Sequence, residues 1–323
     1  MTHAPLKILI VSGTPDALNS NAALRNHVGE GFRTAFPEAV VVVSSHEDGL
    51  RQARALKPDL ALVFGSIMLD SSDFGPLAEA MRRLGGKLAF WLHDDPYEFD
   101  MNARIYGMAD AIFTNDRASL DFYPPNLSVH HLPLAGSHAA HWRPVERRAG
   151  PDLFFCGHRF ANRARLFGDL AAHAKRLGAA MTVLGSGWER DSIDGVTPMR
   201  LPGSALPDLY AAALAVANVG RDENLANRRF AIRPSTPGPR TFEAAFAGAA
   251  QIMLVDGLEI LDYFEPETEI LLADDADGFA AQWERLLCDR DLSLRLGRNA
   301  QRRAEAEHGY EARARRIVDL VFG

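Results

Sequence analysis

Short apolar runs that alternate with longer helical patterns constrain the fold of this chain more than any other feature. The first run, Lys7–Ser12 (KILIVS), ends directly before Gly13. Similar runs follow at Val40–Ser44, Leu60–Gly65, Lys87–Leu92, Ala111–Thr114 and Val129–Leu134. Runs that are apolar throughout are typical of strands buried on both faces of a parallel sheet. With helices expected near 21–35, 47–56, 75–84, 97–107 and 117–122, the pattern predicts β-α-β crossovers and a doubly wound α/β sheet.

The same alternation starts again after residue 150. Strands are expected at Asp152–Cys156, Met181–Leu184, Ala215–Val219, Gln251–Gly257 and Glu269–Asp275, and helices at Ala161–Leu177, near Pro207–Ala213 and from about Pro239. The intervening stretch, 137–150, has no periodicity, as is typical of a linker between domains. We therefore predict a first domain over 1–136, a linker over 137–150 and a second domain over 151–309.

Composition narrows the class of protein. A chain of 323 residues with 47% hydrophobic and 24% charged residues is long enough for two folded domains. Its net charge of −7 argues against a general nucleic-acid binder. The only cysteines, Cys156 and Cys288, cannot form a disulfide framework, so a reducing cytoplasm is expected. We see no signal peptide at the start of the sequence and no apolar run long enough to span a membrane.

The stretch Pro234–Ala250 (PSTPGPRTFEAAFAGAA) predicts a stiff loop that leads into a short helix. Pro239 suits the first position of a helix, and Arg240 and Glu243 are expected in its first turn. The unpaired N–H groups there favour an anion. Phe242 and Phe246, four residues apart, are expected to anchor the helix on a core. The alternative is a well-capped helix in which Glu243 merely suits the helix dipole.

Three segments together resemble the CgeB/YkvP-like glycosyltransferases, relatives of the retaining family-4-type enzymes. They are RTFEAAFAGA (Arg240–Ala249) before the run QIMLVDG, the closing LGRNAQRRAEAEHGYEARARRI (Leu296–Ile317), and HDDPYEF (His93–Phe99). The resemblance implies the GT-B architecture, in which two Rossmann-like domains face each other across a cleft. It also implies that the last helix, 310–323, packs back on the first domain.

The resemblance places a nucleotide-diphosphate sugar on the second domain. Glu243 occupies the position of the second glutamate of the family's motif, which accepts both ribose hydroxyls. The first glutamate is replaced by Ser235, a departure from the pattern that leaves the donor sugar and the stereochemistry open. Backbone amides of Thr236–Thr241 are expected to replace it.

Further donor contacts are expected from loops of the second domain. Arg159 and Arg163 would hold the diphosphate, Gly185 and Gly187 would form the turn beside the donor, and Leu201 would lie where the nucleobase meets backbone atoms. Arg233 and Arg240 flank the stiff segment and are candidates for the sugar or phosphate, with Thr241 beside them. The alternatives are a solvated basic helix face for the arginines and a plain turn for the glycines.

On the first domain, His93 and Asp94 follow the strand Lys87–Leu92. The resemblance implies that His93 touches the donor sugar, and Asp94 is the candidate base if the reaction inverts the sugar. Asp95, Pro96 and Glu98 fit a helix capping box instead. Gly13 and Thr14 follow the first strand and are expected to border the acceptor, although a plain turn explains them as well.

We therefore expect a cytoplasmic, retaining glycosyltransferase that needs neither a metal nor a cofactor, because no His, Asp and Glu cluster has metal-ligand spacing. Its partners would be a nucleotide-sugar donor and an unidentified glycan, protein or small-molecule acceptor. Two alternatives remain: a nucleotide-sugar epimerase or hydrolase on the same fold, and a non-catalytic nucleotide-sugar-binding protein.

Overall fold

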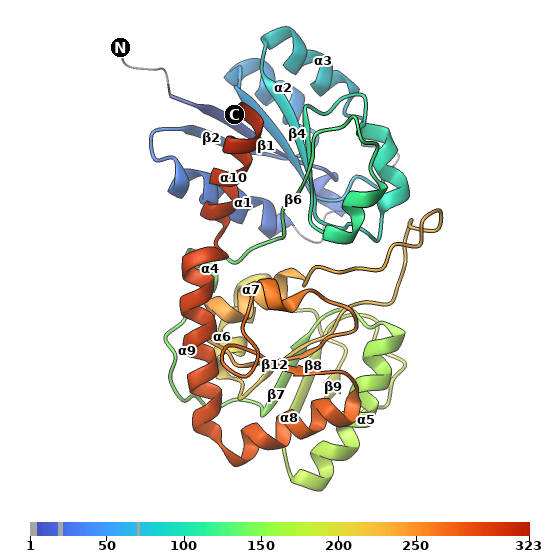
Figure 1. The fold of residues 1–323 in the computed structure, drawn as a ribbon, viewed down its shortest axis with the longest axis vertical. Helices are drawn as coiled ribbons and strands as arrows, with labels where there is room; N and C mark the ends of the chain where they lie inside the picture. Colours follow the sequence, from blue (N-terminus) through green and yellow to red (C-terminus); the bar gives the residue numbers. More distant parts are fainter. Residues whose placement is uncertain (1–4, 19–21, 70–71) are drawn as a thin grey trace. The chain divides into compact units, whose positions relative to one another are not determined.

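The computed structural model describes residues 5–18, 22–69 and 72–323. Its contacts divide the chain into two compact units, each with one sheet (Figure 1). Unit 1 comprises Met1–Leu134, Asn224–Thr236 and Gly309–Gly323. Unit 2 comprises Ala135–Glu223 and Pro237–His308.

The sheet of unit 1 is parallel, with six strands in the order β2-β1-β3-β4-β5-β6. The strands are β1 (Lys7–Ser12), β2 (Val40–Ser44), β3 (Leu60–Phe64), β4 (Lys87–Leu92), β5 (Ala111–Thr114) and β6 (Val129–His131). Every residue of β3 and of β5 is buried, as expected for strands covered on both faces. Each apolar run predicted in this half forms a strand, and β3 and β6 end earlier than predicted.

Helices flank this sheet on both faces. The α-helices are α1 (Ala22–Ala35), α2 (Gly49–Leu56), α3 (Gly75–Leu84) and α10 (Tyr310–Phe322), and the 3₁₀ helices are η1 (Asp16–Leu18), η2 (Phe99–Ile105) and η3 (Arg117–Phe122). The last helix, α10, packs against α1, with the rings of His27 and Tyr310 6.2 Å apart. The N-terminal end of the first predicted helix, residue 21, lies outside the described residues.

The sheet of unit 2 is also parallel and six-stranded, in the order β12-β11-β10-β7-β8-β9. Its strands are β7 (Leu153–Cys156), β8 (Met181–Leu184), β9 (Val196–Thr197), β10 (Val216–Asn218), β11 (Gln251–Leu254) and β12 (Leu271–Ala273). Counted within the unit, this is the strand order of a Rossmann fold. Strand β9 was not predicted, because two residues leave no apolar run to recognise.

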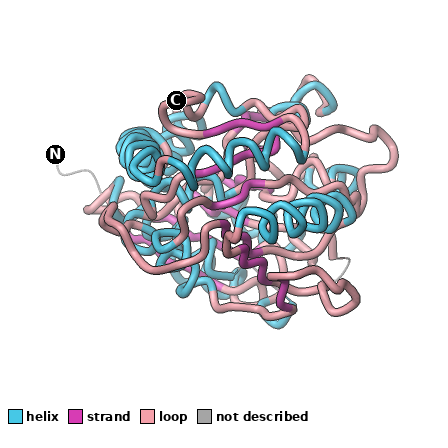
Figure 2. Tube along the Cα trace, turned by 90° about the horizontal axis from the view of Figure 1, so that it is seen from below, coloured by secondary structure: helices cyan, strands magenta, loops and turns pink. Residues whose placement is uncertain are grey.

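The helices of unit 2 are α4 (His138–His141), α5 (Ala161–Leu177), α6 (Leu206–Ala212), α7 (Pro239–Phe246), α8 (Ala276–Cys288) and α9 (Arg290–Glu307), with 3₁₀ helices η4 (Gly203–Ala205) and η5 (Ile260–Asp262). Figure 2 shows helices in cyan around strands in magenta. A core of buried side chains from α5, α8 and the strands includes Phe155, Phe167 and Trp283. None of the described helices is both long and apolar enough to cross a membrane.

The division into units differs from the predicted boundaries in two places. The stretch predicted as a linker, 137–150, contains α4 and lies in unit 2. Segment 224–236, placed in the second domain from the sequence, belongs to unit 1. The physical reason is hydrogen bonding: Ala226 exchanges backbone bonds with Tyr97 and Asp100, and the Ile232 side chain enters the core of unit 1.

Candidate functional site

The strand order of unit 2 reverses between β7 and β10. In open parallel sheets, ligands bind outside the carboxyl ends of the strands at this switch point. Loop 157–160 follows β7 and the loop from Val219 follows β10, so both leave the sheet there. Loop 185–187, after β8, lies beside the loop that follows β7.

Two glycine-containing loops are locked together at this point. The Arg159 N–H donates to Ser186 O at 3.0 Å, and Trp188 Nε1 donates to Gly157 O at 3.0 Å. Gly185 has a φ of +143°, and a Cβ there would lie 2.0 Å from Gly157 O. Only glycine fits this position, and Gly187 completes the turn, also at positive φ. The structure therefore brings the predicted Gly157 and Gly185–Gly187 loops into direct contact.

The Arg163 side chain connects the loop after β7 with the loop after β10. Its side chain is buried and donates to His158 O (2.8 Å), Val219 O (3.0 Å) and Gly220 O (3.0 Å). The guanidinium also lies over the ring of Phe160. These contacts fasten the loop after β7 to the loop after β10. Arg163 therefore positions the two loops, and its direct contact with a diphosphate remains a prediction.

Arg159 lies at the surface of the same loop. Its guanidinium forms two bonds with Asp191, at 2.9 and 3.1 Å, and its side chain is 38% exposed. An exposed pair of this kind is worth little to stability and can be rearranged by a ligand. Arg159 therefore remains a candidate for the diphosphate.

Helix α7 begins at Pro239, with Gly238 at the N-cap. Phe242 and Phe246 are both fully buried, so the predicted apolar anchor is confirmed. Glu243 is the fifth residue of the helix and lies beyond its first turn, which contains no acidic residue. The expectation that Glu243 is in the first turn is therefore wrong, and the helix dipole does not explain it.

Arg240 lies against the end of β7. Its guanidinium donates to Cys156 O and stacks over the Phe155 ring, 4.4 Å from the ring centroid. Its Nε is buried and has no hydrogen-bond partner. A Cβ on Gly157 would lie 2.9 Å from Arg240 Nη2, so the absence of a side chain there permits this approach. Thr241 is buried beside it, and its carbonyl accepts from Gln251 Nε2 at 3.1 Å.

Glu243 belongs to a mostly buried polar cluster that the sequence only partly indicated. Its side chain is 13% exposed, and Oε1 lies 3.9 Å from His141 Nε2 of α4. Burial, with Glu243 nearby, raises the pKa of Tyr210 well above its usual value. Burial also raises the pKa of the Cys156 thiol, against the opposing effect of Arg240. The cluster therefore joins α4, α6, α7 and β7 around one carboxylate.

Two further predicted residues have no recorded contact with Glu243. Leu201 is half-buried and packs on the apolar group of Phe154, Leu184 and Tyr210. Arg233 is exposed and belongs to unit 1, so it is not part of the unit that carries Glu243.

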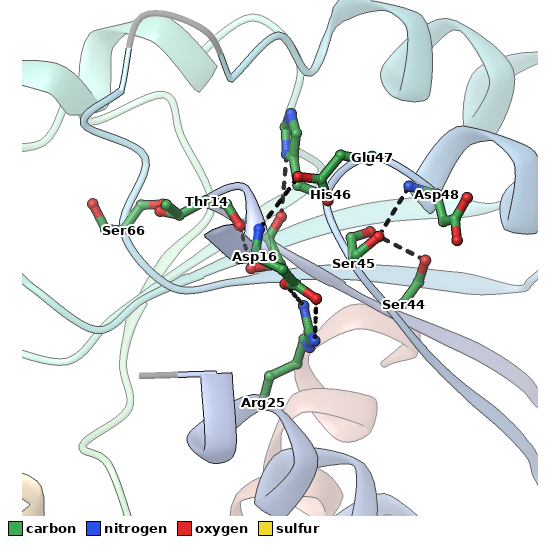
Figure 3. A network of polar contacts seen from close by, with 10 residues as sticks. Thr14, Asp16, Arg25, Ser44, Ser45, His46, Glu47, Asp48 and Ser66 are labelled. Carbon is green, nitrogen blue, oxygen red and sulfur yellow. Dashed lines mark hydrogen bonds and ion pairs between the residues drawn. The ribbon is translucent and has the colours of Figure 1, made fainter. Parts of the chain in front are cut away.

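In unit 1 the strand order reverses between β1 and β3, and Gly13 and Thr14 lie at this switch point. The Gly13 N–H donates to Phe64 O at 2.9 Å, and Thr14 Oγ1 donates to Ser66 O at 2.9 Å. Figure 3 shows Thr14 and Ser66 beside a charged group. In that group Arg25 binds both oxygens of Asp16, at 2.7 and 3.2 Å, and the Asp16 N–H donates to Glu47 Oε1 at 3.3 Å.

His93 and Asp94 form a pair at the carboxyl end of β4. His93 Nε2 lies 2.7 Å from Asp94 Oδ2, and the two side chains are 6% and 20% exposed. A carboxylate at Nε2 favours the tautomer that carries its proton there, which leaves Nδ1 as an acceptor. The structure thus pairs the two side chains, and their roles remain predictions.

The predicted capping box at Asp95 and Glu98 is wrong. Asp95 is fully buried and accepts from Asn102 Nδ2 (2.9 Å), Thr114 Oγ1 (2.7 Å) and Tyr123 OH (2.7 Å). Burial raises the pKa of this carboxyl group, and the three donors act in the opposite direction. The Glu98 carboxylate accepts from Ser66 Oγ at 2.6 Å instead of capping η2. These bonds hold the loop that carries His93.

Asp116, which was not among the residues predicted from the sequence, ties segment 224–236 to the end of β5. Its Oδ2 accepts from the Ser235 N–H at 2.7 Å and the Thr236 N–H at 2.9 Å. Burial raises the pKa of Asp116 to about 6, although these bonds lower it. Ser235, at the position of the missing glutamate, therefore has a structural contact in unit 1. Among the described residues, no group of three or more His, Cys, Asp or Glu side chains could hold a metal ion.

Comparison with known proteins gives the fold and the family of this arrangement. A family model described as glycosyl transferase-like matches residues 152–319. Sucrose-phosphate synthase from Thermosynechococcus elongatus is similar over 98% of each chain, at a TM-score of 0.60 and 15% identity. HepE from Anabaena, in complex with UDP-glucose, is similar over 97% of this chain and 99% of its own, at a TM-score of 0.60 and 14% identity.

A protein assigned as a UDP-N-acetylglucosamine 2-epimerase, from Listeria monocytogenes, is similar over 98% of this chain and 95% of its own. Its TM-score is 0.57 and its identity 13%. None of the curated proteins matches the chain in sequence. At these identities the structures show the fold alone, which is the α/β architecture of two Rossmann-like domains found in GT-B proteins.

Proposed function

Because the chain belongs to the glycosyl transferase-like family, we propose that it transfers a sugar from a nucleotide-diphosphate sugar to an acceptor. The observation that supports this most is the position of Glu243 and Arg240. Both lie on α7, beside the glycine loop after β7, at the switch point of a Rossmann-type sheet. In Rossmann-type folds, nucleotides bind at the switch point of the sheet, outside the carboxyl ends of the strands.

In this proposal the Glu243 carboxylate accepts the two ribose hydroxyls. A carboxylate can accept two hydrogen bonds side by side, and a mostly buried one gains more from each of them. UDP is the first nucleotide to test, since HepE is described in complex with UDP and with UDP-glucose.

Arg240 and Arg159, together with the N–H groups at the start of α7, would neutralise the diphosphate. Positive charge and aligned N–H donors stabilise the leaving group as its charge develops. We therefore propose a reaction that does not require a metal ion.

We further propose a retaining transferase of the CgeB/YkvP-like type. The sequence resemblance supports this. His93 would then orient the donor sugar. The free thiol of Cys288 is exposed, which supports a reducing compartment such as the cytoplasm.

The experiment is to incubate the protein with a panel of nucleotide sugars, with and without candidate acceptors, and to measure nucleotide release and products. A transferase releases the nucleotide in proportion to glycosylated acceptor, and the rate is unchanged by excess EDTA. Loss of activity with EDTA and its rescue by magnesium would contradict the metal-independent mechanism.

The same experiment separates the alternatives. An epimerase would change the sugar without an acceptor and without stoichiometric nucleotide release. A hydrolase would release free sugar, and a binding protein would do neither. The anomeric configuration of the product, read by NMR, then tests retention directly.

A further inference from the structure

His141 lies beside Glu243 but has no place in the resemblance. It is the last residue of α4, a four-residue helix within the stretch predicted as a linker. The side chain is 7% exposed and comes from a different element than Glu243. Burying an imidazole costs free energy unless its polar nitrogens have partners. The two ring nitrogens of His141 have different surroundings.

The first nitrogen closes the start of α4. The Ser137 N–H donates to His141 Nδ1 at 2.9 Å, and Ser137 Oγ accepts from the Ala140 N–H at 3.3 Å. This reciprocal arrangement resembles a capping box. Because a backbone N–H always donates, Nδ1 must be the unprotonated nitrogen, and the ring proton of neutral His141 must be on Nε2.

The second nitrogen faces the proposed ribose-binding carboxylate. Nε2 lies 3.9 Å from Glu243 Oε1. Burial, with Arg143 nearby, lowers the pKa of His141 to about 4, so at neutral pH the ring presents an N–H dipole and no net charge. The capping bond thus fixes the direction of the N–H, and the N–H favours one orientation of the carboxylate.

We propose that His141 is a positioning residue that orients Glu243 for the ribose and so determines selectivity for ribonucleotides over 2′-deoxyribonucleotides. The inference rests on the proposed function, because it gives Glu243 the ribose hydroxyls. His141 itself does not contact the nucleotide. A carboxylate that is already held in one rotamer loses less conformational entropy when the two ribose hydroxyls bind. Removing the imidazole therefore weakens binding of a ribonucleotide more than binding of its 2′-deoxy form.

Two conservative variants separate positioning from helix capping. In His141→Asn the amide oxygen can replace Nδ1 and accept the Ser137 N–H, but the shorter side chain places no donor where Nε2 was. In His141→Gln the amide nitrogen can take the place of Nε2 and present an N–H toward Glu243, while the cap is lost. A purely structural role predicts that Asn is the better substitute, and the positioning role predicts that Gln is.

The test is calorimetric titration with UDP and 2′-deoxy-UDP, and with GDP and 2′-deoxy-GDP as a second pair. We expect His141→Asn to weaken binding of the ribonucleotide by about 3- to 10-fold and binding of its deoxy form by less than about 2-fold. His141→Gln should keep the wild-type ratio of affinities. His138→Gln, on the same helix and with a side chain 63% exposed, is the matched control and should also keep it.

The possible outcomes are distinct. Wild-type selectivity in His141→Asn overturns the positioning role, and so does a larger loss in Gln than in Asn. If the wild-type protein binds both forms equally while Glu243→Ala still weakens both, the ribose assignment fails and this inference fails with it. If neither pair binds at all, the proposed function fails. Thermal unfolding of each variant confirms that the comparison is made between folded proteins.

Discussion

At the scale of single residues, we propose that the pair of His93 and Asp94 contacts the donor sugar. The Asp94 carboxylate accepts from His93 Nε2 at 2.7 Å, so it fixes the tautomer and orientation of the imidazole. We propose that neither residue acts as a general base, as the resemblance to retaining enzymes implies. This favours His93 as the residue that contacts the sugar and Asp94 as the residue that positions it.

Asp94→Asn should therefore lower the rate by about 10-fold or less, well short of the 10²–10⁴-fold typical of a lost general base. His93→Ala should impair use of the nucleotide sugar more than binding of the free nucleotide, because the nucleotide is assigned to unit 2. Steady-state kinetics and calorimetry with UDP measure the two effects. A rate collapse in Asp94→Asn together with an inverted product would contradict the retaining assignment and show that Asp94 takes part in general-base catalysis.

At the scale of elements, the turn after β8 holds the loop after β7 in place. Gly185→Ala would force a Cβ to within 2.0 Å of Gly157 O at a φ of +143°. We expect it to lower the free energy of unfolding by roughly 1–3 kcal/mol and to weaken nucleotide binding, because the Gly157 loop must move.

Gly168→Ala in α5 is the control, since a Cβ there has nothing within 4 Å and alanine favours a helix. Urea unfolding of both variants measures the difference. Equal stability of Gly185→Ala and the wild-type protein would show that the two loops are not held together as described.

The segment 224–236 is anchored by the buried Asp116, which gives its attachment a pH dependence. The pKa of Asp116 is raised to about 6 in the folded protein, above its usual value of 3.8. Between about pH 4 and pH 6 the Asp116 carboxyl group is ionised in the unfolded chain and still protonated in the folded protein. This residue's contribution to stability therefore falls as the pH rises through that window, and it is constant above it.

Asp116→Asn removes the titration. Relative to the variant, the wild-type protein should lose on the order of 1–3 kcal/mol of unfolding free energy between pH 4 and pH 7. Urea unfolding of both proteins at several pH values measures this difference. The contributions of the other carboxylates are the same in both proteins and cancel in the comparison. Parallel curves for the two proteins would contradict the raised pKa.

Sequence reasoning predicted the elements well because their signals are local. The buried strands of both sheets are continuous apolar runs, and Pro239 marks the start of α7. Contacts between distant residues have no such signal. Nothing near Asp116 in the sequence points to Ser235, and nothing in His138–His141 points to Glu243.

Asp95 shows how a local pattern can mislead. Its sequence context fits a helix cap, yet burial beneath the loop gives it three side-chain donors from other elements. Arg163 is similar: the resemblance implied a contact with the diphosphate, and in the structure its guanidinium donates to three backbone carbonyls. A sequence pattern predicts which residues are polar at the site, while tertiary packing decides which of them are exposed to a ligand.

At the scale of the whole molecule, the two sheets carry different parts of the proposed reaction. Unit 2 has the nucleotide candidates on α7 and on the loops after β7 and β8. Unit 1 has His93, Asp94 and the loop of Gly13 and Thr14. The chain passes between the units more than once. A substitution in one unit should therefore leave the fold of the other unit intact if it lies outside the segments that connect them.

The central claim is that unit 2 binds a nucleoside diphosphate through Glu243. Calorimetric titration of UDP and GDP into the wild-type protein, Glu243→Ala and the exposed control Glu284→Ala tests it most directly. We expect at least one nucleotide to bind the wild-type protein and Glu284→Ala equally, and to bind Glu243→Ala about 30- to 150-fold more weakly, as the loss of charged hydrogen bonds predicts. Unchanged affinity in Glu243→Ala, or no binding of either nucleotide to the wild-type protein, would contradict the account.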